Sequence, residues 1–216
     1  CMEHRGGCGG DSDSGDGAGI LCSIPWKYLE EEMKLKNKQD LDRGLGMVFM
    51  PNKKEKIEEC KSICEEEAEK LRVKETSWRT VPVNNEILGP LAKANAPFIC
   101  QWILYIDTKD NQNIERLLFQ LRKRIEKKIR ETFKNDVGDC EFYFASLSSQ
   151  TVVYKGMVRS EILSEFYQDL KKENFKVSFS VYHRRFSTNT LPKWPLAQPM
   201  RFLGHNGEIN TLLGNI

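Results

Sequence analysis

Residues 182–210, YHRRFSTNTLPKWPLAQPMRFLGHNGEIN, determine how the rest of the chain is interpreted. Two short polar clusters lie in this stretch, at residues 183–189 and 205–210. The segment between them carries three prolines. That is too many for an α-helix, because proline lacks the backbone N–H and clashes with the preceding turn. We therefore predict an ordered, extended loop between two chemically rich segments.

The two clusters offer complementary chemistry. The first places arginines beside hydroxyl and amide side chains, which suits the binding of a carboxylate through paired hydrogen bonds. In the second, Asn206 directly precedes Gly207, so a side-chain amide and a backbone N–H can point at one developing negative charge. Together they favour acyl transfer from a small amino acid. Each cluster alone has an ordinary alternative, a surface ion pair or a tight turn.

The order and wording of these motifs, RFSTNT followed by PxWPLAQPxRFLxHNGEINT, resemble the glutaminase domains of glutamate synthases. These domains are class II glutamine amidotransferases of the N-terminal-nucleophile hydrolase superfamily. The resemblance covers nearly the whole chain and leans toward the ferredoxin-dependent type. It implies an α+β fold, a four-layer αββα sandwich that is incomplete at both ends. Residues 1–216 would then form a partial class II amidotransferase domain.

The resemblance also implies an activity, the release of ammonia from L-glutamine for glutamate synthesis from 2-oxoglutarate. Asn206 and Gly207 would form the oxyanion hole, and Arg185 would bind the substrate α-carboxylate. The other substrate-binding residues that the motifs imply are Phe186, Ser187, Thr188, Asn189, Arg5 and Gly6.

The Gly-rich start of the chain, CMEHRGGCGGDSDSGDGAGI at residues 1–20, has two interpretations. Its composition is typical of a flexible linker. However, HRGG at residues 4–7 and GDGAG at residues 15–19 are spaced like tight turns, and both are similar to motifs of the family. We therefore expect an ordered active-site loop that leads into a strand at residues 20–23.

Cys1 is not expected to be the nucleophile, although an N-terminal cysteine attacks the substrate in this superfamily. In the family that cysteine is followed by Gly-x-Gly and lies well before HRG, whereas Met2 to Arg5 follow Cys1 immediately. We therefore expect the nucleophile to be absent from this chain, which would be a fragment that is inactive alone. The family's aspartate that recognises the substrate amine is expected beyond Ile216.

The amino-acid composition indicates which classes of partner and which type of cellular compartment to expect. The net charge is only +2 with 30% charged residues, and no apolar run approaches a membrane span, so neither nucleic acid nor membrane is expected as a partner. Seven scattered cysteines favour a reducing compartment. The resemblance implies that this compartment is the plastid stroma or the cytoplasm. Cys60 and Cys64 lack a second pair at zinc-finger spacing, so we expect helix residues and no metal site.

No cofactor is expected in this segment, because it has neither a dinucleotide-type glycine turn nor a cysteine cluster. For a full-length parent, the resemblance implies FMN and an iron–sulfur cluster on a synthase domain of the same polypeptide. Its electron donor would be ferredoxin or a pyridine-nucleotide-linked subunit. Two alternatives stay open: a non-catalytic binding or assembly domain of the same fold, and the glutaminase half of another class II amidotransferase.

Apolar periodicity alternates between helical and strand-like segments along the chain. We predict helices at residues 25–37, 55–73 and 113–133, and strands at 20–23, 44–51 and 97–107. The resemblance implies further strands at 78–83 and 177–183 and a helix at 160–172. Residues 89–95 are predicted to be a loop, and residues 140–147 and 151–155 to form a β-hairpin. The β-prone strand at 97–107 is expected at the centre of a sheet. Glutamates interleave with the basic residues of 113–133, which predicts a solvated helix face.

Overall fold

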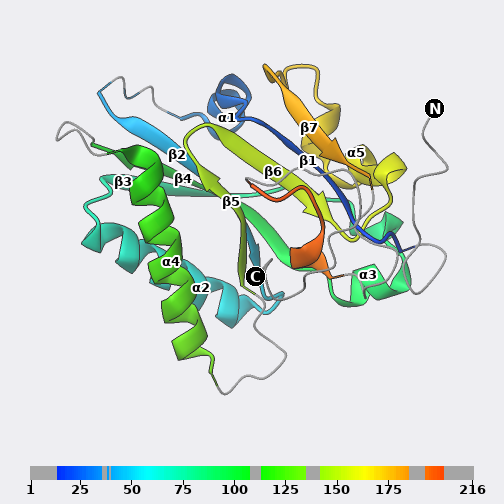
Figure 1. Ribbon diagram of the computed structural model, residues 1–216, viewed down its shortest axis with the longest axis horizontal. Coiled ribbons are helices and arrows are strands. Elements are labelled where there is room, and N and C mark those ends of the chain that lie inside the picture. The colour runs from blue at the N-terminus through cyan, green and yellow to red at the C-terminus, as the bar shows by residue number, and fades with distance from the viewer. Residues whose placement is uncertain are drawn as a thin grey trace. The chain divides into compact units, whose positions relative to one another are not determined.

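The computed structural model describes residues 14–35, 38, 40–107, 113–134, 142–184 and 193–201. These residues form two compact units (Figure 1). One is drawn from Cys1–Cys22, Pro82–Ala96 and Val153–Ile216, and the other from Ser23–Val81 and Pro97–Val152. Both units combine helices with antiparallel strand pairs, in agreement with the expected α+β class. The four-layer arrangement stays a prediction.

The second unit is built on a four-stranded antiparallel sheet in the order β3-β4-β2-β5. Its strands are β2 (Asp42–Met50), β3 (Glu75–Thr80), β4 (Phe98–Ile106) and β5 (Tyr143–Ser148). The predicted central position of β4 is confirmed, because β4 pairs with β2 on one side and β3 on the other. Residues on both faces of β4 are buried, which explains why its sequence is apolar almost throughout.

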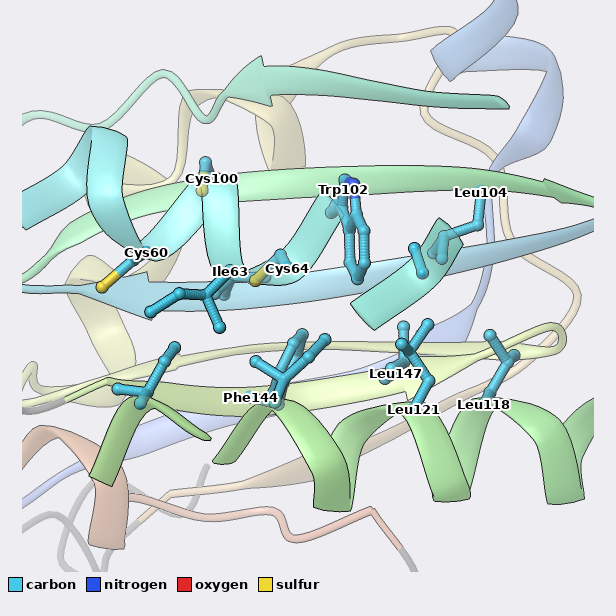
Figure 2. Close-up of a cluster of buried hydrophobic side chains, with 14 of the residues drawn as sticks. Cys60, Ile63, Cys64, Cys100, Trp102, Leu104, Leu118, Leu121, Phe144 and Leu147 are labelled. Atoms are coloured by element: carbon cyan, nitrogen blue, oxygen red, sulfur yellow. The ribbon is translucent and has the colours of Figure 1, made fainter. Parts of the chain in front are cut away.

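Helices α2 (Lys54–Lys70) and α4 (Ile114–Thr132) lie side by side on one face of this sheet (Figure 1). Their apolar residues recur every three or four positions, so one stripe of each helix faces the core. Figure 2 shows side chains from both helices meeting those of β4 and β5. A Cβ at Gly44 would lie 2.9 Å from Leu118 Cδ2, so the glycine allows α4 to pack closely on β2.

The opposite face of the sheet carries a buried polar contact. Side chains alternate along β3, so that Trp78 stacks on Trp102 beneath the helices and Arg79 points the other way. The Arg79 guanidinium donates to Gln101 Oε1 at 2.9 Å and to the hydroxyl of Tyr28 at 3.1 Å. Tyr28 belongs to α1 (Trp26–Met33), which ends earlier than predicted because Lys34 adopts a left-handed conformation.

The predicted role of the helix cysteines is supported, and the basic face of α4 is exposed as predicted except at Arg122, which is buried. Cys60 and Cys64 are buried on α2 within the core cluster of Figure 2. The described cysteines Cys22, Cys60, Cys64 and Cys100 form no disulfide. On α4, Arg124 Nε lies 2.7 Å from Glu67 Oε2, and the exposed Lys127 pairs with Glu131 at 3.8 Å.

The hairpin prediction is wrong, although both strands exist. β5 belongs to the four-stranded sheet, whereas β6 (Thr151–Gly156) joins β1 (Ala18–Ser23) and β7 (Ser180–His183) in a separate sheet of order β6-β1-β7. The turn between β5 and β6 therefore passes the chain from one sheet to the other. Glu115 of α4 holds this turn: its Oε1 accepts from the Ser148 hydroxyl at 3.1 Å, and from the Ser149 N–H and hydroxyl at 2.6 and 2.7 Å.

Two further predictions in the first unit need correction. Residues 89–95 contain a short helix, α3 (Pro90–Ala94), in which Pro90 occupies the first turn, where its missing N–H costs nothing. The helix predicted at 160–172 is interrupted, leaving only α5 (Leu163–Phe166) between 3₁₀ turns. The interruption lies at Tyr167, which adopts an extended conformation and forms a β-bridge with Val83. None of the described helices is long and apolar enough to cross a membrane.

Replacing Glu115 by alanine is expected to lower the free energy of unfolding by about 1 to 3 kcal/mol, because the turn loses its charged acceptor. Urea denaturation measures this loss. Glu131→Ala is the matched control on the same helix, since its ion pair is exposed, and its effect should stay within about 0.5 kcal/mol. Equal losses for the two variants would contradict the role assigned to Glu115.

Candidate active site

The residues predicted for the site fall in three segments that lie outside the described residues: Arg5, Gly6, Arg185, Phe186, Ser187, Thr188, Asn189, Asn206 and Gly207. The structure does describe residues that adjoin each segment in sequence, at 14–19, 183–184 and 193–201. These adjoining residues gather at one end of the three-stranded sheet. Their contacts define the frame of the candidate site.

The glycine motif at residues 15–19 packs tightly against its neighbours. A Cβ at Gly15 would lie 2.1 Å from the carbonyl carbon of Val158, and one at Gly19 would lie 2.5 Å from the Gln198 carbonyl oxygen. Gly17 has a φ of 130°, which favours glycine. Ser14 is buried, and its Oγ accepts from the Ala92 N–H at 3.1 Å. The described residues of this motif therefore form an ordered loop, as predicted, and not a flexible linker.

The end of β7 lies beside the start of β1, because His183 pairs with Gly19. Arg184 follows His183, and its guanidinium donates to Ser160 Oγ at 3.1 Å and to Glu161 Oε1 at 2.8 Å. A backbone hydrogen bond at Glu161, with those from Ser160 and Arg184, lowers the pKa of the Glu161 carboxyl. Arg184 is thus engaged within its own unit.

The proline-rich segment is ordered at residues 193–201 and contains a short 3₁₀ turn, Trp194–Leu196, rather than being extended throughout. The Trp194 indole is buried, and its Nε1 donates to the Ala92 carbonyl at 3.2 Å. Its ring lies on Gly156 of β6, where a Cβ would come within 2.5 Å of Cζ3. Glycine at this position of β6 therefore makes room for the indole.

Lys155, the residue before Gly156, lies fully buried against the same segment. Its Nζ donates to the Pro195 carbonyl at 2.8 Å and lies 3.8 Å from Met200 Sδ. Desolvation by burial, with a smaller effect from the charge of Arg201, lowers the pKa of Lys155 from 10.5 to about 7. Nearby, the buried Gln198 Oε1 has no hydrogen-bond partner among the residues that the structure describes.

Sequence reasoning treated Lys155 only as a strand residue and so missed it. The available signal was a lysine inside the apolar run VVYKGMV at residues 152–158. A lysine in a strand that is buried on both faces must bury its ammonium, and buried lysines need a partner. Within the described chain, no group of His, Cys, Asp and Glu side chains is arranged to hold a metal ion.

The whole chain, residues 1–216, matches the family described as Glutamine amidotransferases class-II. The chain belongs to this family. The match confirms the family inferred from the motifs.

Three relatives of this class II domain are ferredoxin-dependent glutamate synthases. The chloroplastic protein of Oryza sativa subsp. japonica is 49% identical over 220 residues, synthase 2 of Synechocystis is 50% identical over 220 residues, and the Pyropia yezoensis protein is 48% identical over 219 residues. Each match covers 100% of this chain but only 13% to 14% of the relative. The expected similarity to the ferredoxin-dependent type is thereby confirmed.

Lys155→Met is expected to change how the stability of the class II domain depends on pH. The folded-state pKa of Lys155 is lowered from 10.5 to about 7, so between these values the unfolded state binds more protons than the folded state. The stability cost of the buried lysine is thus fully present below pH 7 and is relieved as pH rises above it. Urea unfolding at about pH 6 and about pH 9 should show the parent gaining stability relative to the variant. A difference that does not change with pH would contradict this assignment.

Proposed function

We propose that this class II domain is the glutaminase of a glutamate synthase and releases ammonia from L-glutamine for glutamate synthesis from 2-oxoglutarate. The observation that carries the proposal is the convergence of the described residues next to each motif. Gly19 is paired with His183 and packs on the Gln198 backbone, so the three chain segments leave the sheet at one end. Three segments that are distant in sequence can form one site only if they start close together in space.

The proposed reaction is an acyl transfer to a cysteine thiol. The thiolate attacks the side-chain amide carbon of glutamine and forms a tetrahedral oxyanion. When the C–N bond breaks, the nitrogen takes up a proton and leaves as ammonia, and water then hydrolyses the γ-glutamyl thioester to glutamate. Asn206 and Gly207 donate hydrogen bonds to the oxyanion. Cys1 is not the attacking residue in this proposal, because HRG follows it too closely.

Substrate recognition is assigned to two motif segments, one at residues 185–189 and one at residues 5–6. Arg185 binds the α-carboxylate, because a guanidinium forms paired hydrogen bonds with a carboxylate. In the proposal, Phe186, Ser187, Thr188 and Asn189 shape the pocket around it, and Arg5 and Gly6 also line the pocket. The contacts of Arg184 support the choice of Arg185 for substrate binding, since the Arg184 guanidinium already binds Glu161 and Ser160.

We extend the proposal to the larger protein, because the chain spans only 13% to 14% of its relatives' length. The relatives' names support a ferredoxin-dependent parent, and that of the Oryza sativa protein adds a chloroplastic location. In our proposal the parent carries a synthase domain on the same polypeptide and works in plastid stroma or cytoplasm. FMN and an iron–sulfur cluster would transfer electrons in that parent. Among the residues that the structure describes, no group of His, Cys, Asp and Glu side chains could hold a metal ion. The family also supports the four-layer αββα sandwich as the architecture of the complete domain.

Asn206→Ala tests the proposed chemistry in the protein of full natural length. Removal of one oxyanion donor should lower kcat for glutamine hydrolysis by about 100- to 1,000-fold, with a much smaller change in KM. Ammonia release measures both constants, and Cys1→Ala should keep the parent's activity. A parent protein that folds, binds its partners and releases no ammonia would overturn the proposal in favour of a binding or assembly domain.

Arg185→Ala is expected to act on substrate binding instead. Loss of a charged hydrogen-bond donor should lower kcat/KM for glutamine by about 10- to 100-fold, mainly through KM. Arg184→Ala is the matched control, because it removes the neighbouring guanidinium, whose partners are Glu161 and Ser160. The control should lower thermal stability and leave KM within about threefold. The reverse pattern would show that the two arginines have been assigned the wrong way round.

A further inference from the structure

The fully buried Lys155 has no part in the proposed reaction, yet it contacts the segment that leads to the oxyanion hole. Side chains alternate along β6, so Tyr154 and Lys155 point to opposite faces. Tyr154 faces an aromatic cluster, with its hydroxyl 3.2 Å from Asp169 Oδ2 and its ring 5.1 Å from that of Tyr167. Lys155 faces the other way, onto residues 193–201 (Figure 1, orange).

A buried lysine is costly where an apolar side chain would fill the same space. The amine donates to a main-chain carbonyl, that of Pro195. The 3₁₀ turn is closed by hydrogen bonds from Leu196 and Ala197 to the carbonyl of Lys193, and Lys155 secures it from the side. Met200 Sδ, close to the other end of the segment, lies 3.8 Å from the same Nζ. One side chain thus contacts the segment at both Pro195 and Met200.

The neighbouring backbone completes this attachment. The Trp194 ring rests on Gly156, and the Gln198 carbonyl packs on Gly19. Tyr167 donates from its hydroxyl to the carbonyl of Lys155 at 2.7 Å, which fixes the β6 backbone at the point where the lysine side chain begins. The segment is therefore held on a rigid strand, and it continues in sequence to Asn206 and Gly207 within a few residues.

We propose that Lys155 is a positioning residue for the oxyanion hole, which it aligns by tethering Pro195 and Met200 to β6. The inference rests on the proposed function of Asn206 and Gly207. Both protonation states of a lysine amine can donate a hydrogen bond, so the tether persists on either side of neutral pH. Arg201, at the end of the segment, carries a charge that acts on the Lys155 amine.

The kinetic signature of this role follows from where the tether acts. An oxyanion hole contacts charge that develops in the transition state, so a small displacement of its donors lowers kcat more than it raises KM. Misplacement of a catalytic group by about 1 Å can cost on the order of 100-fold in rate. A purely structural lysine would affect the amount of folded protein and leave both constants of the folded fraction unchanged.

Lys155→Met in the full-length protein tests the inference by steady-state glutamine hydrolysis at one pH. Methionine has a similar length and avoids burying an ammonium, so the melting temperature should not fall. We expect kcat to fall by about 10- to 100-fold with KM for glutamine within about twofold. The matched control is Tyr154→Phe on the opposite face of β6, which loses the bond to Asp169 and should lower the melting temperature without lowering kcat.

The possible outcomes separate this inference from the proposed function. If the parent hydrolyses glutamine, Asn206→Ala is impaired and Lys155→Met is normal, only the role of Lys155 is overturned. If Tyr154→Phe lowers kcat as much as Lys155→Met does, the role of Lys155 is overturned as well. Met200→Ala, at a half-buried position, provides the same test if Lys155→Met does not fold, with an expected fall in kcat of about threefold or more. A parent without ammonia release would instead refute the proposed function.

Discussion

At Gly19 three pieces of backbone meet without room for a side chain, and the candidate site depends on this contact. A Cβ there would lie 2.5 Å from the Gln198 carbonyl oxygen, 2.6 Å from Lys155 Cβ and 2.7 Å from the Tyr154 carbonyl oxygen. Real Cβ contacts do not become so short, so any other residue would force β1, β6 and the proline-rich segment apart. The glycine motif thereby allows these backbones to pack closely. We infer that it acts on catalysis indirectly, because this packing brings together the chain segments next to the site motifs.

The elements that could be predicted from sequence are those whose own residues determine them. In β4 a run rich in β-branched and aromatic residues was sufficient, and in α4 the spacing of Leu117, Leu121 and Ile125 was sufficient. The failures involve partners distant in sequence. Ser148 and Ser149 indicate a turn, but nothing local tells which sheet the next strand joins. The helix at 160–172 is interrupted because Tyr167 pairs with Val83 and donates to the Lys155 carbonyl.

For the site, sequence motifs and structure contribute different parts. Arg185, Asn206 and Gly207 were inferred from motif wording, and they lie outside the described residues, so their roles stay predictions. The structure contributes the supports: Arg184 bound to Glu161, Trp194 seated on Gly156, and Lys155 tethering Pro195. Periodicity could not reveal these supports, because each joins residues that are distant in sequence.

The buried thiols have a consequence for chemical labelling. Burial raises the pKa of Cys22 and Cys100 to about 12. It also raises the pKa of Cys64 well above its usual value, with Cys100 and Glu65 adding to the effect. Thiolates are the reactive species, so these side chains are almost entirely unreactive toward electrophiles at neutral pH while the fold is intact. Glutamine-like electrophiles, which alkylate an activated cysteine, should therefore leave these three cysteines unlabelled in the folded protein. Their appearance among the labelled residues would report unfolding of the core, and not turnover.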